Sequence, residues 1–317
     1  MQKDARSMVE AGVLSAVAVV FAVINLYIPL LGIFLNVFWP VPLVLLGVRH
    51  GLKWSALALA SSALILAIIV NPLQSLLQAA GLGGIGLVLG WSLNKGNPPV
   101  MTLGFGAAAS LLSKILVIAL LFLFAGGNPF DLGPETIAKA VSDTMELYRS
   151  FGMSDAELAQ IKPIVESTLN MMKLILPAGI VFAAFFDAYA NLWLARAILG
   201  RLGTFTPGLP EFKNLLLHQH FLLFYGVSLL LTALLKNQPD SLFYQASVNA
   251  NFIMAMPILL QGIAVAWSFS YRKNWPGISR WLLVSMLILL QPVSIVVIFL
   301  GMADFVFDFR KLRPPRT

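Results

Sequence analysis

The chain has 317 residues, of which 59% are hydrophobic and 11% charged, and its mean hydropathy is +0.86. Soluble chains carry about 25% charged residues, so this composition excludes a soluble protein and predicts an all-α, polytopic bundle of membrane helices. The absence of cysteine excludes disulfides and cysteine-ligated metals. The net charge of +7 does not indicate nucleic-acid binding, because the bases lie in short loops between apolar segments.

Apolar segments follow one another along the whole chain and predict eight or nine transmembrane helices, because about 20 apolar residues cross a bilayer core. The first continues to Ile28 without a cleavage site, so we interpret it as a retained helix. The second is short and holds Pro40 and Pro42, so we expect it to be bent or incomplete. The segments lie at 8–28, 31–48, 53–70, 73–93, 101–127, 172–199, 215–235, 243–271 and 281–303.

The basic residues predict an orientation in the cytoplasmic (inner) membrane of a bacterial cell, with the N-terminus in the cytoplasm. Nine crossings would then leave the basic tail, 304–317, on the outside. Either the last segments do not cross as counted or the tail is an exception to the positive-inside rule. The bases that fall on the cytoplasmic side are Lys3, Arg6, Arg49, Lys53, Lys95, Arg196, Arg201, Lys213, Arg272, Lys273 and Arg280.

Residues 128–170 form one polar insert between the membrane segments at 1–127 and those at 171–303. The insert holds seven of the fourteen acidic residues and three bases, so we expect it on the extracytoplasmic side. One amphipathic helix is predicted to open at Pro134 and another at the capping box Ser154-x-x-Glu157, with a kink at Pro163. The pair is either an interfacial hairpin that tethers two membrane helices or a lid over an outward-facing pocket.

A single charge, Lys114, lies near the middle of the apolar stretch 101–127. A charge at this depth costs at least about 2.5 kcal/mol, so a partner is expected. Asp187 lies at a matching depth of the next membrane segment, and Asn191 is four residues further along the same helical face. These residues predict an intramembrane polar cluster, which is either a coupling or substrate pair or a structural ion pair.

A group of polar and aromatic residues near the outer ends of the early segments is a candidate pocket. Gln74 and Gln78 share one face of a helix. Tyr27, Asn36 and Trp39 fall near the same level. The remaining intramembrane amides are more typical of hydrogen bonds between helices than of ligand contacts. These are Asn25, Asn249, Asn251, Gln261 and Gln291.

Other patterns give no catalytic or metal site. Gly81, Gly83 and Gly86 spell a dinucleotide-binding fingerprint, but no strand precedes them, and Gly86-x-x-x-Gly90 instead predicts close contact between helices. His218 and His220 would point apart on a helix, and His50 is expected to be solvated. We therefore expect neither an enzyme nor a bound metal or cofactor.

Short motifs at both ends of the chain resemble the YybS-like family of multi-pass bacterial membrane proteins, over nearly the whole length. That family has no established activity, so the resemblance implies no catalytic residues. The motifs are Glu10, Tyr27-Ile-Pro-Leu-Leu-Gly32, Trp39-Pro-Val-Pro42, Arg49-His-Gly-Leu-Lys-Trp54, Gly301-Met-Ala-Asp304 and Phe307-Asp-Phe-Arg310.

The first six segments are also similar, more weakly, to the six-helix S component of energy-coupling-factor vitamin transporters. That resemblance implies a small-residue face on the first helix for a coupling subunit, which Ala18 and Ala22 match. The acidic insert 128–170 and the three segments after Arg201 depart from the pattern.

Two functions follow as hypotheses. An S-component-like protein would bind a small-molecule ligand in the outer pocket and contact a coupling subunit. A membrane scaffold or envelope-assembly protein would instead bind lipid, other membrane proteins or a second copy of itself, and its pocket would be filled.

Overall fold

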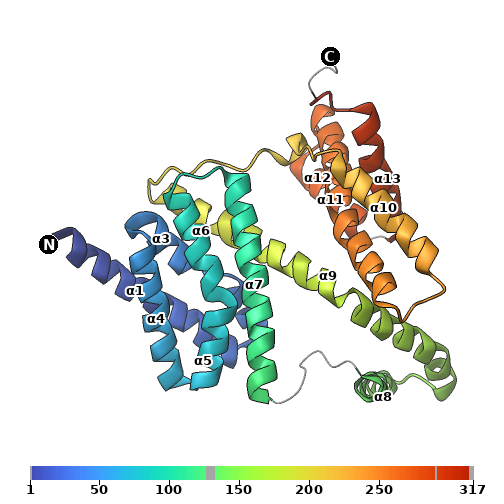
Figure 1. Ribbon diagram of the computed structural model, residues 1–317, viewed down its shortest axis with the longest axis horizontal. Coiled ribbons are helices and arrows are strands. Elements are labelled where there is room, and N and C mark those ends of the chain that lie inside the picture. The colour runs from blue at the N-terminus through green and yellow to red at the C-terminus, as the bar shows by residue number, and fades with distance from the viewer. Residues whose placement is uncertain (1, 126–132, 290, 314–317) are drawn as a thin grey trace. The chain divides into compact units, whose positions relative to one another are not determined.

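The computed structural model describes residues 2–125, 133–289 and 291–313, and over these residues the chain forms helices and no strand (Figure 1). The first half contains α1 (Gln2–Tyr27), α2 (Pro29–Val37), α3 (Val41–His50), α4 (Leu52–Ile69), α5 (Pro72–Gln78), the π-helical turn η1 (Ala79–Gly83), α6 (Gly84–Asn94) and α7 (Pro99–Ala125). The second half contains α8 (Pro134–Ser150), α9 (Asp155–Arg201), the 3₁₀ turn η2 (Phe212–Asn214), α10 (His220–Leu235), α11 (Leu242–Arg272), α12 (Gly277–Leu289) and α13 (Gln291–Phe307).

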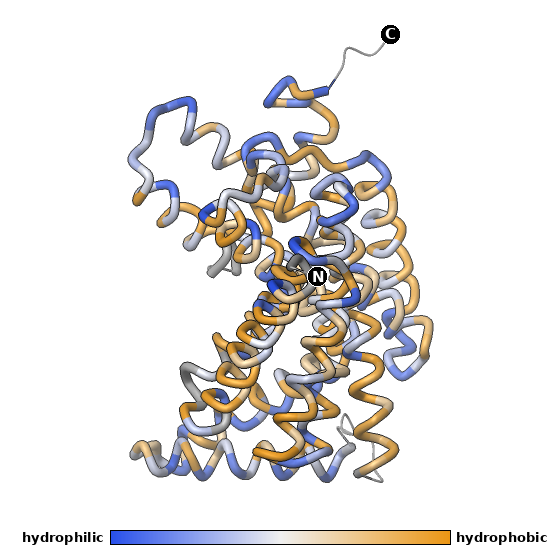
Figure 2. The backbone as a smooth tube through the Cα atoms, turned by 90° about the vertical axis from the view of Figure 1, so that its left-hand side faces the viewer, coloured by the Kyte–Doolittle hydropathy of each residue, from blue (hydrophilic) through white to orange (hydrophobic). Residues whose placement is uncertain are grey.

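Apolar residues run along most of the helices, except the mixed, amphipathic α8, and many hydrophilic residues lie at helix ends and connections (Figure 2). Within the described residues, six helical runs are long and apolar enough to cross a membrane: α1, α4, α5 to α6, α7, α9 and α11. Shorter apolar helices lie at 34–50, 220–235, 277–287 and 293–307. The chain is therefore a multi-pass, all-helical membrane protein.

The chain divides into two compact units, and α9 contributes to both. Unit 1 consists of Met1–Thr136 and Ile180–Leu209, and unit 2 of Ile137–Gly179 and Pro210–Thr317. This division follows packing rather than the order of apolar and polar segments, since the first part of α9 groups with the C-terminal helices and its second part with the N-terminal ones.

Small residues bring the helices of unit 1 close together. Ala18 and Ala22 of α1 are buried in a core shared with Ala58 and Leu66 of α4. A Cβ on Gly90 of α6 would lie 2.9 Å from the Cα of Gly47 on α3. The predicted contact through the glycines of α6 is thus confirmed, and it explains them without a nucleotide.

The polar insert is not separate from the sixth membrane segment. The predicted helix starts at Pro134 and after Ser154 are confirmed, and the Ser154 backbone N–H donates to Glu157 Oε2 over 2.8 Å. However, α9 continues through Pro163 and Pro177 for 47 residues, about 70 Å at 1.5 Å per residue. A proline removes one backbone hydrogen bond, and in this helix neither proline ends it.

Unit 2 is built around α11, which packs against α10 and α13. Tyr225, Ile258 and Phe305 form one core cluster, and Ile263, Leu287 and Val297 form another. The stretch 281–303, expected to be one membrane helix, is two shorter helices, α12 and α13. The second begins at Gln291-Pro292, where proline fits a first helical turn.

Candidate functional site

The structure brings the two predicted mid-membrane charges together in unit 1. Lys114 of α7 and Asp187 of α9 form an ion pair through the Lys114 Nζ and the Asp187 Oδ2. Ser110, one turn before Lys114, donates to the same Asp187 oxygen over 3.2 Å and accepts from Lys114 Nζ over 3.1 Å. The side chains of Lys114 and Asp187 are 23% and 14% exposed, so the pair lies mostly among protein atoms rather than on the surface.

Asn191 connects this ion pair to the break between α2 and α3. Its Nδ2 donates to the backbone carbonyl of Asp187 over 2.8 Å and to the carbonyl of Val37 over 2.9 Å. Val37 is the last residue of α2, and Val41, four residues later, donates to Phe38 instead. Because the helix is interrupted, the Val37 carbonyl does not accept from the N–H of Val41, and the buried Asn191 amide donates to it instead.

Gln78 and Asn36 extend the polar contacts from the end of α2 to α5. Gln78 Nε2 of α5 donates to Asn36 Oδ1 of α2 over 2.6 Å. Asn36 immediately precedes Val37, so polar groups continue from α5 to α7. We call this set the polar track, which consists of Gln78, Asn36, Asn191, Asp187, Lys114 and Ser110.

Two buried polar atoms, one in the polar track and one in the turn after α2, have no hydrogen-bond partner in the structure. They are Nε1 of Trp39, a donor, and Oδ1 of Asn191, an acceptor. Both residues are fully buried. An unpaired buried group costs about 1–3 kcal/mol, so this part of unit 1 has unused hydrogen-bonding capacity.

The expected outer pocket is largely filled. Trp39 lies in the core of unit 1 instead of lining a cavity, and Tyr27 is 80% exposed. Gln74 and Gln78 do share a cavity with Asn25, but its volume is about 20 Å³. A space of that size is large enough for about one water molecule, whereas pockets for drug-sized ligands measure about 300–1,000 Å³.

The small-residue face proposed for a coupling subunit is also covered. Ala18 and Ala22 are buried against α4 of the same unit. Ser15, on the same face of α1, donates to the carbonyl of Ala58 over 3.3 Å. The structure corrects the expectation of a free face, because α1 uses these residues for its own packing.

The sequence interpretation missed a charged cluster at the start of unit 1. Glu10 Oε2 of α1 lies 2.7 Å from His50 Nε2 and 3.0 Å from Arg49 Nη1 of α3. The other ring nitrogen of His50 lies 2.8 Å from Ser7 Oγ. The expectation of a solvated His50 was wrong. The sequence did contain a signal, since Glu10 and Arg49-His50 are both family motifs, and the structure shows that these two motifs contact each other.

A second missed cluster lies in unit 2, where Asp304 and Arg310 form a buried ion pair. Arg310 Nη2 lies 2.8 Å from Asp304 Oδ2, and Gln261 Nε2 of α11 donates to the same oxygen over 3.0 Å. The side chains of Asp304 and Arg310 are 0% and 2% exposed. Arg310 also donates to the carbonyls of Lys213 and Leu215, over 2.9 and 2.8 Å. The cluster fixes the end of α13 to the segment before α10.

The amide of Asn249 confirms the predicted role of such residues in joining helices. Its Nδ2 donates to the carbonyl of Leu174 over 2.8 Å, and its Oδ1 accepts from the N–H of Ala178 over 2.9 Å. These two backbone groups are four residues apart and would normally bond to each other. Asn249 of α11 thus takes both partners beside Pro177 of α9.

The two neighbouring histidines do not lie on opposite sides of a helix. α10 begins at His220, so His218 lies outside it, and the ring centroids are 4.3 Å apart. No group of three or more potential metal ligands is found among the described residues.

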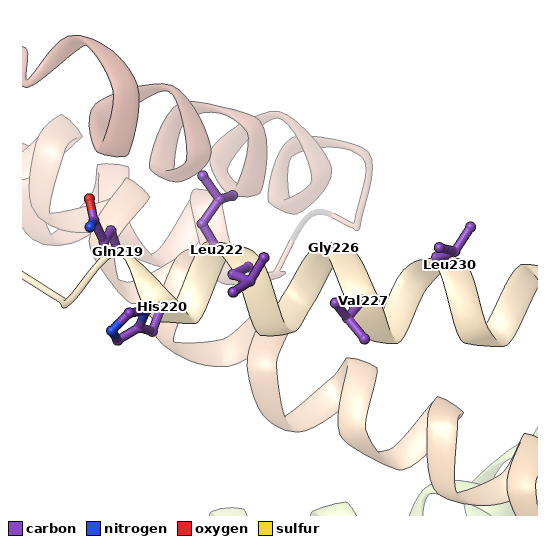
Figure 3. Close-up of a pocket in the computed structure, with 7 residues that line it drawn as sticks. Gln219, His220, Leu222, Gly226, Val227 and Leu230 are labelled. Atoms are coloured by element: carbon purple, nitrogen blue, oxygen red, sulfur yellow. The ribbon is translucent and has the colours of Figure 1, made fainter.

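His220 and Gln219 lie at one end of an open hollow of about 570 Å³ along α10, and Leu230 lies at the other (Figure 3).

Comparison with known proteins supports the family resemblance. A family model described as a predicted membrane protein (DUF2232) matches residues 16–305. The chain is 23% identical over 309 residues to the uncharacterized protein YybS of Bacillus subtilis, which covers 97% of this chain and 98% of that protein. No solved structure matches the chain significantly. The matched range covers most of the chain, which therefore belongs to the DUF2232 family of predicted membrane proteins.

Proposed function

We propose that the protein is a membrane transport component whose unit 1 binds a small polar solute or ion at the polar track. The observation that carries this proposal is the Lys114–Asp187 ion pair, held between α7 and α9 and connected by hydrogen bonds to the broken helix α2–α3. Charged residues and interrupted helices at membrane depth are both typical of solute and ion pathways.

The composition of unit 1 supports a relation to S components. Its six apolar stretches are α1, α2–α3, α4, α5–α6, α7 and the second part of α9. The small cavity beside Gln78 limits the ligand that fits without rearrangement. A vitamin-sized ligand would require the Gln78–Asn36 hydrogen bond to open, whereas an ion or a very small solute would not.

Orientation is part of the proposal. We place the N-terminus, the Glu10–Arg49–His50 cluster and the basic connections on the cytoplasmic side of the inner membrane, because bases concentrate on that side. The acidic helix α8 would then lie on the extracytoplasmic side. We propose no catalytic role for any of these residues.

Thermal unfolding of the purified protein against a panel of vitamins, nucleobases and monovalent cations tests the proposal. A ligand at 100 times its Kd stabilises by about 2.7 kcal/mol, which is readily measured. Asn36→Leu should abolish the shift by removing an amide of the polar track, while Lys139→Gln on the exposed face of α8 should retain it. If no compound in the panel shifts the wild-type transition, the proposal is contradicted.

A scaffold that binds other membrane proteins is the second candidate, favoured by the largely filled outer pocket and by the exposed apolar side of α10. Leu223, Val227 and Leu230 line the hollow there, and Figure 3 labels the last two. Filling it by Gly226→Leu should change the oligomeric mass in mild detergent if the hollow receives a second copy. An unchanged mass, together with a ligand shift, would favour transport.

A further inference from the structure

Three stretches of the chain that are far apart in sequence meet at one end of unit 2. Arg310 Nη1 donates to the Lys213 carbonyl over 2.9 Å, and Arg272 Nη2 donates to the Arg310 carbonyl over 3.2 Å. Lys213 Nζ lies 4.0 Å from the ring centroid of Tyr271. The segment before α10, the end of α11 and the C-terminal tail therefore share one end of the unit.

Positive charge is concentrated at this end and is only partly neutralised. Seven bases of the described residues lie there with three acids, Glu211, Asp304 and Asp308. Asp304 pairs with Arg310 and Glu211 with Lys213. Among the described residues, the five remaining bases at this end of unit 2 form no ion pair with a carboxylate. We call four of these the basic patch, which consists of the exposed Arg272, Lys273 and Lys311 and the half-buried Arg280.

The third acid is used within the tail. Burial raises the pKa of the Asp308 carboxyl, but this effect is outweighed by hydrogen bonds from the backbone N–H groups of Arg313 and Leu312 and by the charges of Arg313 and Arg310, so the pKa lies below its usual value. Asp308 is therefore ionised at neutral pH and holds the turn after α13. Its negative charge is used by contacts within the tail and does not pair with a residue of the basic patch.

Aromatic rings surround the basic patch. The guanidinium of Arg280 lies 5.1 Å from the Tyr271 ring and 5.9 Å from the Trp267 ring. Trp267 in turn contacts Trp281, with ring centroids 5.4 Å apart. Trp275 and Trp281 are exposed. Tryptophan and tyrosine concentrate at the level of lipid headgroups, where basic residues attract anionic lipids.

We propose that the basic patch binds the phosphate headgroup of an anionic phospholipid, with Trp275 and Trp281 lying at the boundary of the acyl chains. The opposite end of α11 offers a contrast. The connection from α10 to α11 carries one base, Lys236, and one acid, Asp240. An anionic headgroup is therefore expected to bind at the basic end of unit 2 and not at the end that carries Lys236 and Asp240. This site is independent of the solute site proposed in unit 1.

Lipid binding to the full-length protein in detergent tests the proposal, with phosphatidylglycerol and phosphatidylcholine of equal acyl chains as probes and native mass spectrometry as the readout. We expect preferential retention of phosphatidylglycerol. Each base near a membrane surface contributes about 1 kcal/mol, so Lys273→Gln/Lys311→Gln should weaken binding about 25-fold. Both side chains are exposed, so this variant is expected to fold.

The matched control Lys236→Gln should bind phosphatidylglycerol as the wild type does. Adding Arg280→Gln to the double variant should weaken binding about fivefold further. Equal retention of the two lipids by the wild type, or undiminished phosphatidylglycerol binding by the double variant, would overturn the proposal. Soluble glycerol phosphate serves as a headgroup-only probe, and displacement of the lipid by it at equal concentration would also count against a lipid site.

Discussion

At the scale of residues, the Lys114–Asp187 pair was predictable because charges deep in apolar segments are rare and need partners. The sequence also indicated their depth, since the distance of each residue from its helix end can be counted. The role of Asn191 was only partly predictable. Its contact with the Val37 carbonyl depends on where α2 ends, which a proline-containing segment does not reveal.

The ion pair predicts a coupling in stability. Lys114→Met or Asp187→Leu alone leaves one charge among protein atoms, and each is expected to lower the unfolding free energy by about 3 kcal/mol. The double variant removes both charges and should be destabilised by much less than the sum. Unfolding of the single and double variants in mixed micelles measures this difference. Strictly additive effects would show that the two residues do not interact.

Asp304 was noted only as part of a family motif, and its burial was not predicted, because the last apolar segment was ended at residue 303, one position before it. Charges near a segment end are usually solvated, and only the tertiary structure shows that Gln261 and Arg310 enclose this carboxylate. Its Oδ1 has no partner, so the hydrogen bonds of the cluster converge on the other oxygen.

Asp304→Asn should therefore be costly. The change leaves the Arg310 charge buried without its counter-ion, and a loss of about 3–5 kcal/mol in unfolding free energy is expected. Asp240→Asn, in an exposed connection of the same unit, is the control and should change stability by less than about 0.5 kcal/mol. Thermal unfolding compares the two, and similar stabilities would mean that the buried pair contributes nothing.

At the scale of elements, the number and position of most helices could be predicted from apolar length and capping residues. The continuity of α9 and the division between α12 and α13 could not. A kink was expected at Pro163, and neither Pro163 nor Pro177 ends α9, whereas Pro292 lies in the first turn of a new helix. A proline removes one backbone N–H donor from a helix. Whether the helix ends there depends on tertiary contacts such as those of Asn249.

Several family motifs have a packing role at this scale. A Cβ on Gly32 would lie 2.2 Å from the Cα of Asn25, and one on Gly301 would lie 2.2 Å from the carbonyl oxygen of Ile258. On the facing helix, a Cβ on Gly262 would lie 2.0 Å from the carbonyl oxygen of Val297. The glycines therefore allow α11 and α13 to approach closely.

Gly301→Ala should separate α11 from α13. The added methyl meets backbone, which cannot rotate away, so we expect a loss of about 1–3 kcal/mol in unfolding free energy. Gly226→Ala in α10 is the matched control, because no atom lies within 4 Å of its Cβ position. Alanine is the better helix former, so this control should be neutral or up to about 1 kcal/mol stabilising. Equal effects of the two substitutions would contradict the proposed close packing.

At the scale of the whole molecule, the structure bears on the side of the membrane that the tail occupies. α11 has 31 residues, about 46 Å at 1.5 Å per residue, and can cross the bilayer. α12 and α13, with 13 and 17 residues, are each shorter than a full span. Because Arg272 bonds to Arg310, the tail lies at the same end of unit 2 as the basic end of α11.

Cysteine labelling tests this arrangement directly, since the chain has no cysteine of its own. Asn274→Cys and Lys311→Cys should react with an impermeant maleimide from the same side of sealed vesicles. Asp240→Cys, at the other end of α11, should react from the opposite side. If Lys311→Cys and Asp240→Cys reacted from the same side, the arrangement would be contradicted, and the last apolar segment would have to cross the membrane.

The most direct test of the central claim is the ligand response of Lys114→Met/Asp187→Leu. An ion pair that only joins two helices can often be replaced by apolar residues without loss of stability. We predict that this variant unfolds near the wild-type temperature but loses the stabilisation that an active panel compound gives the wild type. A variant that retained the full ligand shift would show that the pair is structural and that unit 1 binds its ligand elsewhere.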